Sequence, residues 1–166
     1  MINHPAYNAT FCDDRPLHVV AYTDAAGIGG AEISLGHLIA TVSSHIRITV
    51  IGTSAKVVEA IGKYRPESIS IVLPNQGVSS YLSHIKTFQQ IRPDILHFNC
   101  CTPWANAIGL TTALFTSRAK IVRVDQLPLR TTDMVTLWRH RALCLRVDAH
   151  VAVGQASAQG WKTFTP

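Results

Sequence analysis

The sequence of 166 residues is poor in charge and has no long uninterrupted hydrophobic run. Charged residues make up 15% of it, against about a quarter in an average soluble domain, while 47% are hydrophobic. Such a composition excludes a disordered or fibrous protein. No stretch reaches the roughly 18 consecutive apolar residues of a membrane span. The sequence therefore predicts a single globular domain that does not cross a membrane.

Several catalytic and metal-binding signatures are also missing. The sequence has no GxxxxGK[ST] phosphate loop, no GxSxG nucleophile turn, no HExxH zinc helix and no Asp-x-Asp pair. Its four cysteines show no CxxC spacing, which favours reduced thiols in a cytoplasmic protein. We therefore expect neither a metal nor a bound cofactor.

The charge that is present is unevenly distributed. Residues 1–83 carry five basic and six acidic side chains, whereas residues 84–166 carry ten basic and four acidic ones. A basic half favours phosphate-bearing partners, such as nucleotide diphosphates or anionic lipid head groups. Nucleic acid is not expected, because aromatic side chains are not interleaved with the basic ones.

Strand-like and helix-like segments alternate along the chain. The expected strands are 17–23, 46–51, 69–73, 94–98, 120–124 and 149–153. The expected helices follow the glycines near residue 30 and span 55–65, 78–91, 104–115 and 133–146, with a further helix starting at 155. Near-continuous apolar strands that alternate with helices imply an α/β fold with a doubly wound, Rossmann-like and mostly parallel sheet. We assign this domain to residues 17–166 and a flexible lead-in to residues 1–16.

Ligands of such sheets bind beyond the carboxyl ends of the strands, where the strand order reverses. Three loops reach that edge, namely 24–32, 99–103 and 125–130. In the first, Gly29 and Gly30 let the backbone approach a ligand without a Cβ clash, although a tight turn with no ligand explains them equally simply. Asn99 is well placed for a ligand hydroxyl, whereas His97 either binds substrate or is a hydrogen-bonded core histidine.

The loop after the fifth expected strand adds two candidate phosphate contacts, Arg123 and Arg130. A dinucleotide site is disfavoured, because the GxGxxG pattern needs a glycine where this sequence has Glu32. The second strand also ends at Thr53, without the acidic residue that would hold an adenosine ribose.

Four runs of the sequence carry a family resemblance: HVVAYTDAAGIGGAEISLGHLI, RPDILHFN, AKIVRVDQLP and VDAHVAVGQASAQGW. In this order and at this spacing they resemble the amino-terminal half of family-4 retaining glycosyltransferases, which have the GT-B fold. The resemblance covers the chain from about residue 17 to its end. Its most specific piece is the loop that contains Gly29, Gly30 and Glu32.

The resemblance implies transfer of a sugar from a nucleotide-sugar donor, a co-substrate, to a glycolipid or polysaccharide-precursor acceptor. In the family, the amino-terminal domain binds the acceptor and a carboxyl-terminal domain binds the donor. Gly29 and Gly30 would approach the donor's phosphates and sugar, and Glu32 would cap the helix start. Asp125 stands where relatives usually carry a histidine that contacts the donor sugar, and we assign it as the catalytic residue. Gly154 replaces a serine common in the family.

The carboxyl-terminal domain is absent from this sequence, so we expect a truncated chain that is inactive alone. Glycosyl transfer needs a stabiliser for the departing diphosphate and positioning of two substrates. The alternative is a non-catalytic sugar-binding or anion-binding module. The basic helix 133–146 is either an ordinary sheet-covering helix or a patch that rests on an anionic membrane, at the inner face of the membrane for a cytoplasmic protein.

Overall fold

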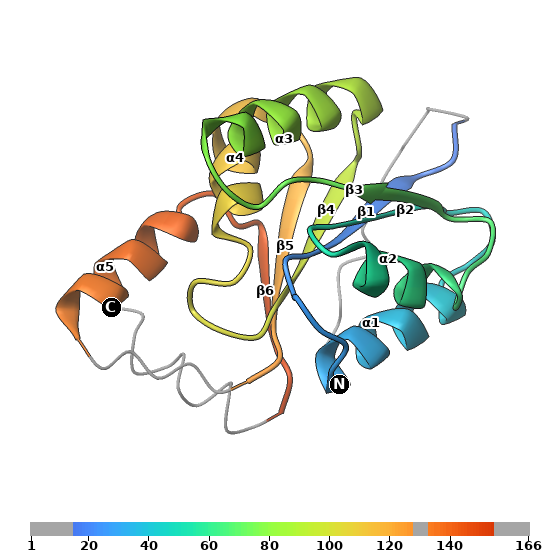
Figure 1. Ribbon diagram of the computed structural model, residues 1–166, viewed down its shortest axis with the longest axis horizontal. Coiled ribbons are helices and arrows are strands. Elements are labelled where there is room, and N and C mark those ends of the chain that lie inside the picture. The colour runs from blue at the N-terminus through green and yellow to red at the C-terminus, as the bar shows by residue number, and fades with distance from the viewer. Residues whose placement is uncertain (1–14, 128–132, 155–166) are drawn as a thin grey trace, which may run out of the picture.

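The computed structural model describes residues 15–127 and 133–154, in which strands and helices alternate strictly (Figure 1). The strands are β1 His18–Thr23, β2 Arg47–Gly52, β3 Ile69–Val72, β4 Ile95–Cys100, β5 Lys120–Asp125 and β6 Ala149–Ala152. The helices are α1 Gly30–Thr41, α2 Ala55–Gly62, α3 Val78–Ile91, α4 Ala107–Thr116 and α5 Met134–Leu143.

All six strands form one parallel sheet in the order β3-β2-β1-β4-β5-β6. The predicted doubly wound, Rossmann-like α/β fold is therefore confirmed, and so is each expected strand. The strand order reverses between β1 and β4, which lie side by side with Val20 opposite Leu96. This is the position at which open α/β sheets leave a crevice for ligands.

The helices cover the two faces of the sheet with separate apolar cores. On one face α1 and α2 pack Leu35, Ile39 and Val58 against β1 and β2. On the other face α3, α4 and α5 cover a second cluster that includes Phe88 and Leu110. Figure 1 shows these two groups of helices on opposite sides of the strands.

Three helices are shorter than the sequence pattern predicts, among them α5, which spans Met134–Leu143 and not residues 133–146. Helix α4 begins at Ala107 and not at residue 104, because Asn106 adopts a left-handed conformation (φ 63°) that no α-helix can include. Helix α2 ends at Gly62 and not at Arg65. The Arg65 guanidinium instead donates to the carbonyl oxygens of Ile39 and Val42 at the end of α1, at 3.1 and 2.9 Å.

Three sequence predictions fall wholly or partly outside the described residues. They are the lead-in over residues 1–16, of which 1–14 lie outside, the phosphate contact Arg130 and the helix from residue 155. At the start of the described chain, Arg15 makes two hydrogen bonds to the Asp94 carboxylate. None of the described helices is both long enough and apolar enough to span a bilayer.

Candidate functional site at the carboxyl edge of the sheet

The glycine loop connects β1 to α1, and Gly29 is the residue that precedes the first helical turn. The buried carboxylate of Glu32 accepts a hydrogen bond from the Gly29 N–H at 3.0 Å and one from the Thr23 hydroxyl at 3.4 Å. Glutamate at the third helical position satisfies an N–H that the helix itself cannot pair. Glu32 thus fixes the helix start to the end of β1.

Gly30 faces open space. A Cβ built on Gly30 would have no neighbouring atom within 4 Å, and one on Gly29 would meet only the Glu32 carboxylate, at 3.4 Å. Neither glycine has a positive φ, so the backbone conformation does not require glycine at either position. Because Gly29 and Gly30 lack side chains, a ligand can approach their backbone from solvent.

A clasp between Asp24 and Asn106 holds the loop after β1 to the start of α4. The Asn106 N–H donates to the Asp24 carboxylate at 2.6 Å, and the Asp24 N–H donates to the Asn106 side-chain oxygen at 2.8 Å. The Asn106 amide nitrogen also donates to the carbonyl oxygen of Asn99 at 2.8 Å. Burial, with a smaller contribution from the Glu32 charge, raises the pKa of Asp24.

Asn99 lies at the end of β4 and is buried. Its amide nitrogen donates to the carbonyl oxygen of Ala31 at 3.2 Å, and its side-chain oxygen accepts a hydrogen bond from Gln126 at 2.6 Å. The side chain therefore joins α1, β4 and the loop after β5. Its predicted contact with a ligand hydroxyl stays a prediction, and the protein's own groups engage both ends of the amide.

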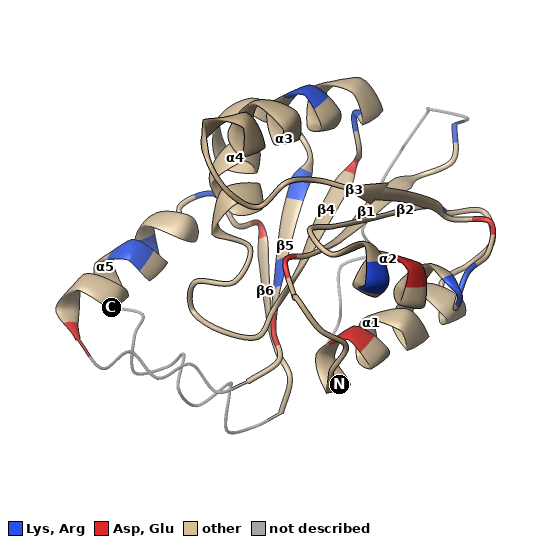
Figure 2. Cartoon of the chain, viewed as in Figure 1, with Lys and Arg blue, Asp and Glu red and all other residues tan. Residues whose placement is uncertain are grey.

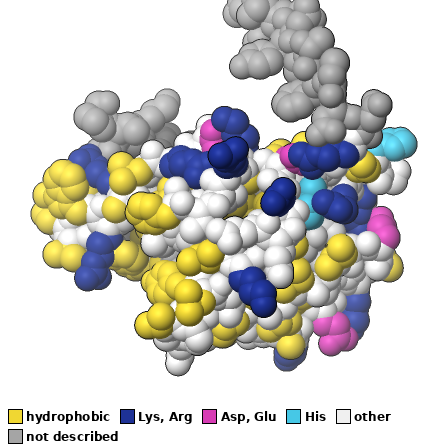
Figure 3. Space-filling model, turned by 90° about the horizontal axis from the view of Figure 1, so that it is seen from above, with side chains coloured by type: hydrophobic (Ala, Val, Ile, Leu, Met, Phe, Trp, Pro, Cys, Tyr) yellow, Lys and Arg dark blue, Asp and Glu magenta, His cyan; other side chains and the backbone are white. Residues whose placement is uncertain are grey.

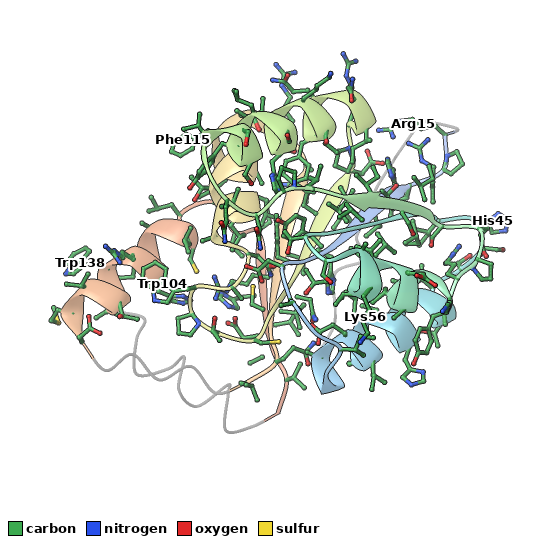
Figure 4. The ribbon with its side chains drawn as sticks, viewed as in Figure 1. Arg15, His45, Lys56, Trp104, Phe115 and Trp138 are labelled. Carbon is green, nitrogen blue, oxygen red and sulfur yellow. The ribbon has the colours of Figure 1, made fainter. Side chains whose placement is uncertain are left out.

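A crevice opens between the loops that follow β1 and β4, with a volume of about 270 Å³. It is lined by Thr23, Asp24, Ala25, Asn99, Cys101, Thr102, Trp104 and Ala105. The lining thus combines a carboxylate, two hydroxyls and an indole, a set that suits a ring bearing hydroxyl groups. Trp104 is held by the Arg139 guanidinium of α5, which lies 5.2 Å from the ring centre; Figure 4 labels this tryptophan.

Arg123 and Asp125 do not line this crevice. Both side chains point to the side of β5 that α5 covers, and both are fully buried. The Asp125 carboxylate accepts hydrogen bonds from Arg123 Nε at 3.0 Å and from His150 Nε2 at 2.5 Å. Burial alone would raise the pKa of Asp125, but the His150 hydrogen bond and the Arg123 charge outweigh it and hold the pKa below its usual range.

These contacts give Arg123 and Asp125 a part in the interior of the fold, between β5, β6 and α5. The Arg123 guanidinium also donates to the Pro103 carbonyl oxygen at 3.4 Å. The roles assigned from the sequence, catalysis for Asp125 and phosphate binding for Arg123, stay predictions, and each would require the side chain to leave its buried partner.

His97 lies within β4 between the paired strands β1 and β5, in register with Ala21 and Val122. Burial lowers the pKa of His97 from its ordinary value to about 4. The imidazole is therefore neutral near pH 7, and its predicted contact with substrate stays a prediction.

The structure thus brings together Gly29, Gly30, Glu32 and Asn99 at one edge, and it separates Arg123 and Asp125 from them. The sequence analysis missed Asp24, Asn106 and Trp104. Asparagine tolerates the left-handed conformation better than most residues, but nothing local in the sequence indicates its partner Asp24, which is 82 residues away. Figure 2 shows acidic residues at the end of β1 and in the first part of α1.

Neither a family model nor a curated protein matches the sequence. Solved structures do. Anabaena Alr3699/HepE in complex with UDP superposes with a TM-score of 0.68 at 15% identity, over 89% of this chain and 40% of its own. The lipopolysaccharide outer core galactosyltransferase WaaB gives 0.58 at 14% identity, over 90% and 42%.

A Listeria monocytogenes protein assigned as a UDP-N-acetylglucosamine 2-epimerase is also similar, with a TM-score of 0.61 at 12% identity, over 89% of this chain and 41% of its own. The chain therefore spans about two fifths of the length of these neighbours. At such low identity the likeness concerns the fold alone. The described chain has the architecture of one Rossmann-like half of a GT-B fold.

Proposed function

We propose that this chain is the acceptor-binding half of a retaining, family-4 glycosyltransferase that takes its sugar from a nucleotide-sugar donor. The observation that carries the proposal is the crevice between the loops that follow β1 and β4, which joins Asp24, Thr102 and Trp104. An aromatic face and a carboxylate are the groups with which proteins hold a sugar ring and its hydroxyls.

The structural neighbours support the donor class. HepE has been crystallised with UDP, with UDP-glucose, and with UDP and glucose, and WaaB is a galactosyltransferase. Under this proposal the acceptor is a glycolipid or polysaccharide precursor. The donor is held by a second domain, because transfer needs a group that stabilises the departing diphosphate. The proposed transfer uses no metal and no resident cofactor.

Titration of the chain with glucose, UDP-glucose and NAD, followed by amide resonances, tests the crevice. We expect glucose to shift the resonances of Asp24, Gly30 and Thr102, UDP-glucose to bind no more tightly because its diphosphate meets the Asp24 carboxylate, and NAD to leave the resonances unchanged. Trp104→Ala should weaken sugar binding about fivefold, since a stacked ring contributes about 1 kcal/mol. Trp138→Ala, an exposed tryptophan on α5, is the matched control.

Sugar binding that is equal in both tryptophan variants would contradict the crevice as the site.

Catalysis separates the transferase from a non-catalytic binding module. The chain joined to its donor-binding partner should transfer sugar with retention at the anomeric carbon, and Asp24→Asn should reduce that transfer. A chain that binds sugar but shows no transfer with any such partner would instead support the binding module.

One surface feature favours a peripheral membrane contact at the inner face of a cytoplasmic membrane. Helix α5 exposes Met134, Val135 and Trp138, each more than half exposed, beside Arg139 and Arg141. Figure 3 shows hydrophobic and basic side chains mixed at this end of the molecule, and Figure 4 labels Trp138 on its outer side. Apolar side chains flanked by arginine suit an anionic lipid surface.

Sedimentation with vesicles tests this contact. The chain should bind vesicles that contain phosphatidylglycerol, bind pure phosphatidylcholine weakly, and lose binding in Trp138→Ser. Equal sedimentation with both lipids, or an unaffected variant, would argue against the contact.

A further inference from the structure

A second cavity lies at the opposite, amino-terminal edge of the sheet, between the carboxyl ends of α3 and α4. Its volume is about 680 Å³, within the range of about 300–1,000 Å³ of small-molecule sites. It is lined by Arg15, Phe88, Gln89, Arg92, Pro93, Asp94, Thr116, Ser117, Arg118 and Ala119. Three arginines therefore face one carboxylate.

The single carboxylate is already neutralised within the chain. Asp94 accepts hydrogen bonds from both terminal nitrogens of Arg15, at 3.0 and 2.5 Å, and from the His18 N–H at 2.8 Å. Partial burial opposes ionisation, but these hydrogen bonds outweigh it and hold the pKa of Asp94 below its usual range. Asp94 thus remains charged and offsets Arg15, leaving the charges of Arg92 and Arg118.

Basic residues commonly lie at helix carboxyl ends because they complement the helix dipole. At this edge, groups other than the side chains of Arg92 and Arg118 satisfy the carbonyl oxygens at the helix carboxyl ends. Arg146 donates to the carbonyl oxygens of Ala113 and Leu114, at 3.3 and 3.1 Å, and to that of Ser117. Helix α3 ends through the backbone of Arg92, whose N–H donates to the Phe88 carbonyl oxygen at 3.1 Å.

Across residues 15–127 and 133–154, the side chains of Arg92 and Arg118 make no hydrogen bond or ion pair with a described group. Both are exposed at the rim of the cavity. Ser117 accepts a hydrogen bond from the Ala119 N–H at 3.1 Å, so its own hydroxyl hydrogen is available to donate. Figure 3 shows several basic side chains on the face of the molecule that is seen from above.

We propose that this cavity binds a soluble small molecule that carries a phosphate or diphosphate group. Arg92 and Arg118 hold the oxyanion by charge-assisted hydrogen bonds, and the Ser117 hydroxyl donates to it from the wall. The site lies at the edge of the sheet away from the crevice of the proposed function and does not depend on that function. No described group belongs to both sites.

Calorimetric titration of the chain with inorganic pyrophosphate at low salt tests the site. We expect binding with a Kd of about 1 mM or below that weakens as salt is added. The double variant Arg92→Gln with Arg118→Gln should weaken it at least about tenfold. The double variant Lys56→Gln with Lys63→Gln removes the same charge from the exposed side of α2 and should bind as the unsubstituted chain does.

The melting temperature of each variant verifies that it folds. The single variant Arg118→Gln, at an exposed position, should already bind pyrophosphate more weakly than the unsubstituted chain. Amide resonances of Ser117 and Ala119 should shift when pyrophosphate binds. Equal affinity in both double variants would overturn the proposal, since it would show general attraction to a basic protein. Absence of binding, or binding to anionic vesicles alone, would overturn it as well. A chain that fails to bind sugar at the crevice should still bind pyrophosphate here, so the two proposals can fail separately.

Discussion

Replacement of Asp125 by asparagine probes the buried charges between β5 and α5. The substitution keeps the shape of the side chain and removes its charge, so that the fully buried Arg123 guanidinium loses its counter-ion. Breaking one partner of a buried ion pair costs about 3–5 kcal/mol, against a total stability of about 5–15 kcal/mol for a domain. His150 loses the charged acceptor of its hydrogen bond in the same step.

Urea unfolding followed by circular dichroism measures this loss. A matched control is Asp148→Asn, because the pair of Asp148 with Lys120 is largely exposed and such pairs contribute about 0–1 kcal/mol. A second control, Arg123→Met combined with Asp125→Asn, removes both charges and should recover much of the lost stability.

The stability that Asp125 contributes depends on pH. The folded pKa of Asp125 is lower than the unfolded value, which is near 3.9. Its contribution is therefore complete above that unfolded value and is lost as the pH falls through the folded pKa. The difference between the unsubstituted chain and Asp125→Asn should shrink in this acidic range. A cost below about 1 kcal/mol at pH 7 would refute the buried pair as a stabilising element.

Three further substitutions test other parts of the structure. Burial, helped by the nearby positive charge of β5, lowers the pKa of the buried His140 to about 4, so the unfolded chain takes up this proton first, near pH 6.5. His140 should contribute about 2 kcal/mol to the loss of stability between pH 6.5 and 5, beside the contribution of the similarly shifted His97. His140→Gln should reduce the slope in urea titrations by this share, and an unchanged slope would contradict it. Gly109→Ala should cost about 1–3 kcal/mol, since its Cβ would lie 2.8 Å from the Tyr22 ring. Gly30→Ala, in open space, should instead raise the free energy of unfolding by about 0.5–1 kcal/mol. Equal melting temperatures of the Gly30→Ala and Gly109→Ala variants would therefore contradict the close packing of Gly109 against Tyr22. Asn106→Ala should cost at least about 2 kcal/mol, because it loses the side-chain hydrogen bonds of the clasp and keeps a left-handed backbone; thermal melts unchanged by this substitution would count against the clasp.

The fold could be predicted because the sheet is parallel and covered on both faces. Strands buried on two sides become continuous apolar runs, such as ILHF in β4 and ITVI in β2. Turn residues then separate these runs from the helices. The errors lie at helix ends, at Asn106, Gly62 and Leu143, where the local backbone conformation decides the boundary and the hydrophobic period carries no information.

The candidate site could be predicted only in part. Topology alone places the glycine loop and the end of β4 at one edge, but the clasp of Asp24 with Asn106 joins residues far apart in sequence. Arg123 and Asp125 are two positions apart on one strand, which puts them on the same face and allows an ion pair. Which helix covers that face follows from the tertiary structure, and α5 covers it.

The orientation of the helices explains why the two edges of the sheet differ in charge, and this bears on which ligand each edge accepts. In a parallel α/β fold helix amino ends lie at the carboxyl edge of the sheet and helix carboxyl ends lie at the other, and their dipoles favour acidic and basic residues respectively. Glu32 caps α1 and Asp133 caps α5, while Arg65 and Arg146 cover helix carboxyl ends. With Asp24 the carboxyl edge repels a diphosphate and accepts hydroxyl donors. Under the proposed function, a nucleotide sugar that reacts there needs its diphosphate neutralised by a second wall, so the charge of this half favours the acceptor as its own ligand.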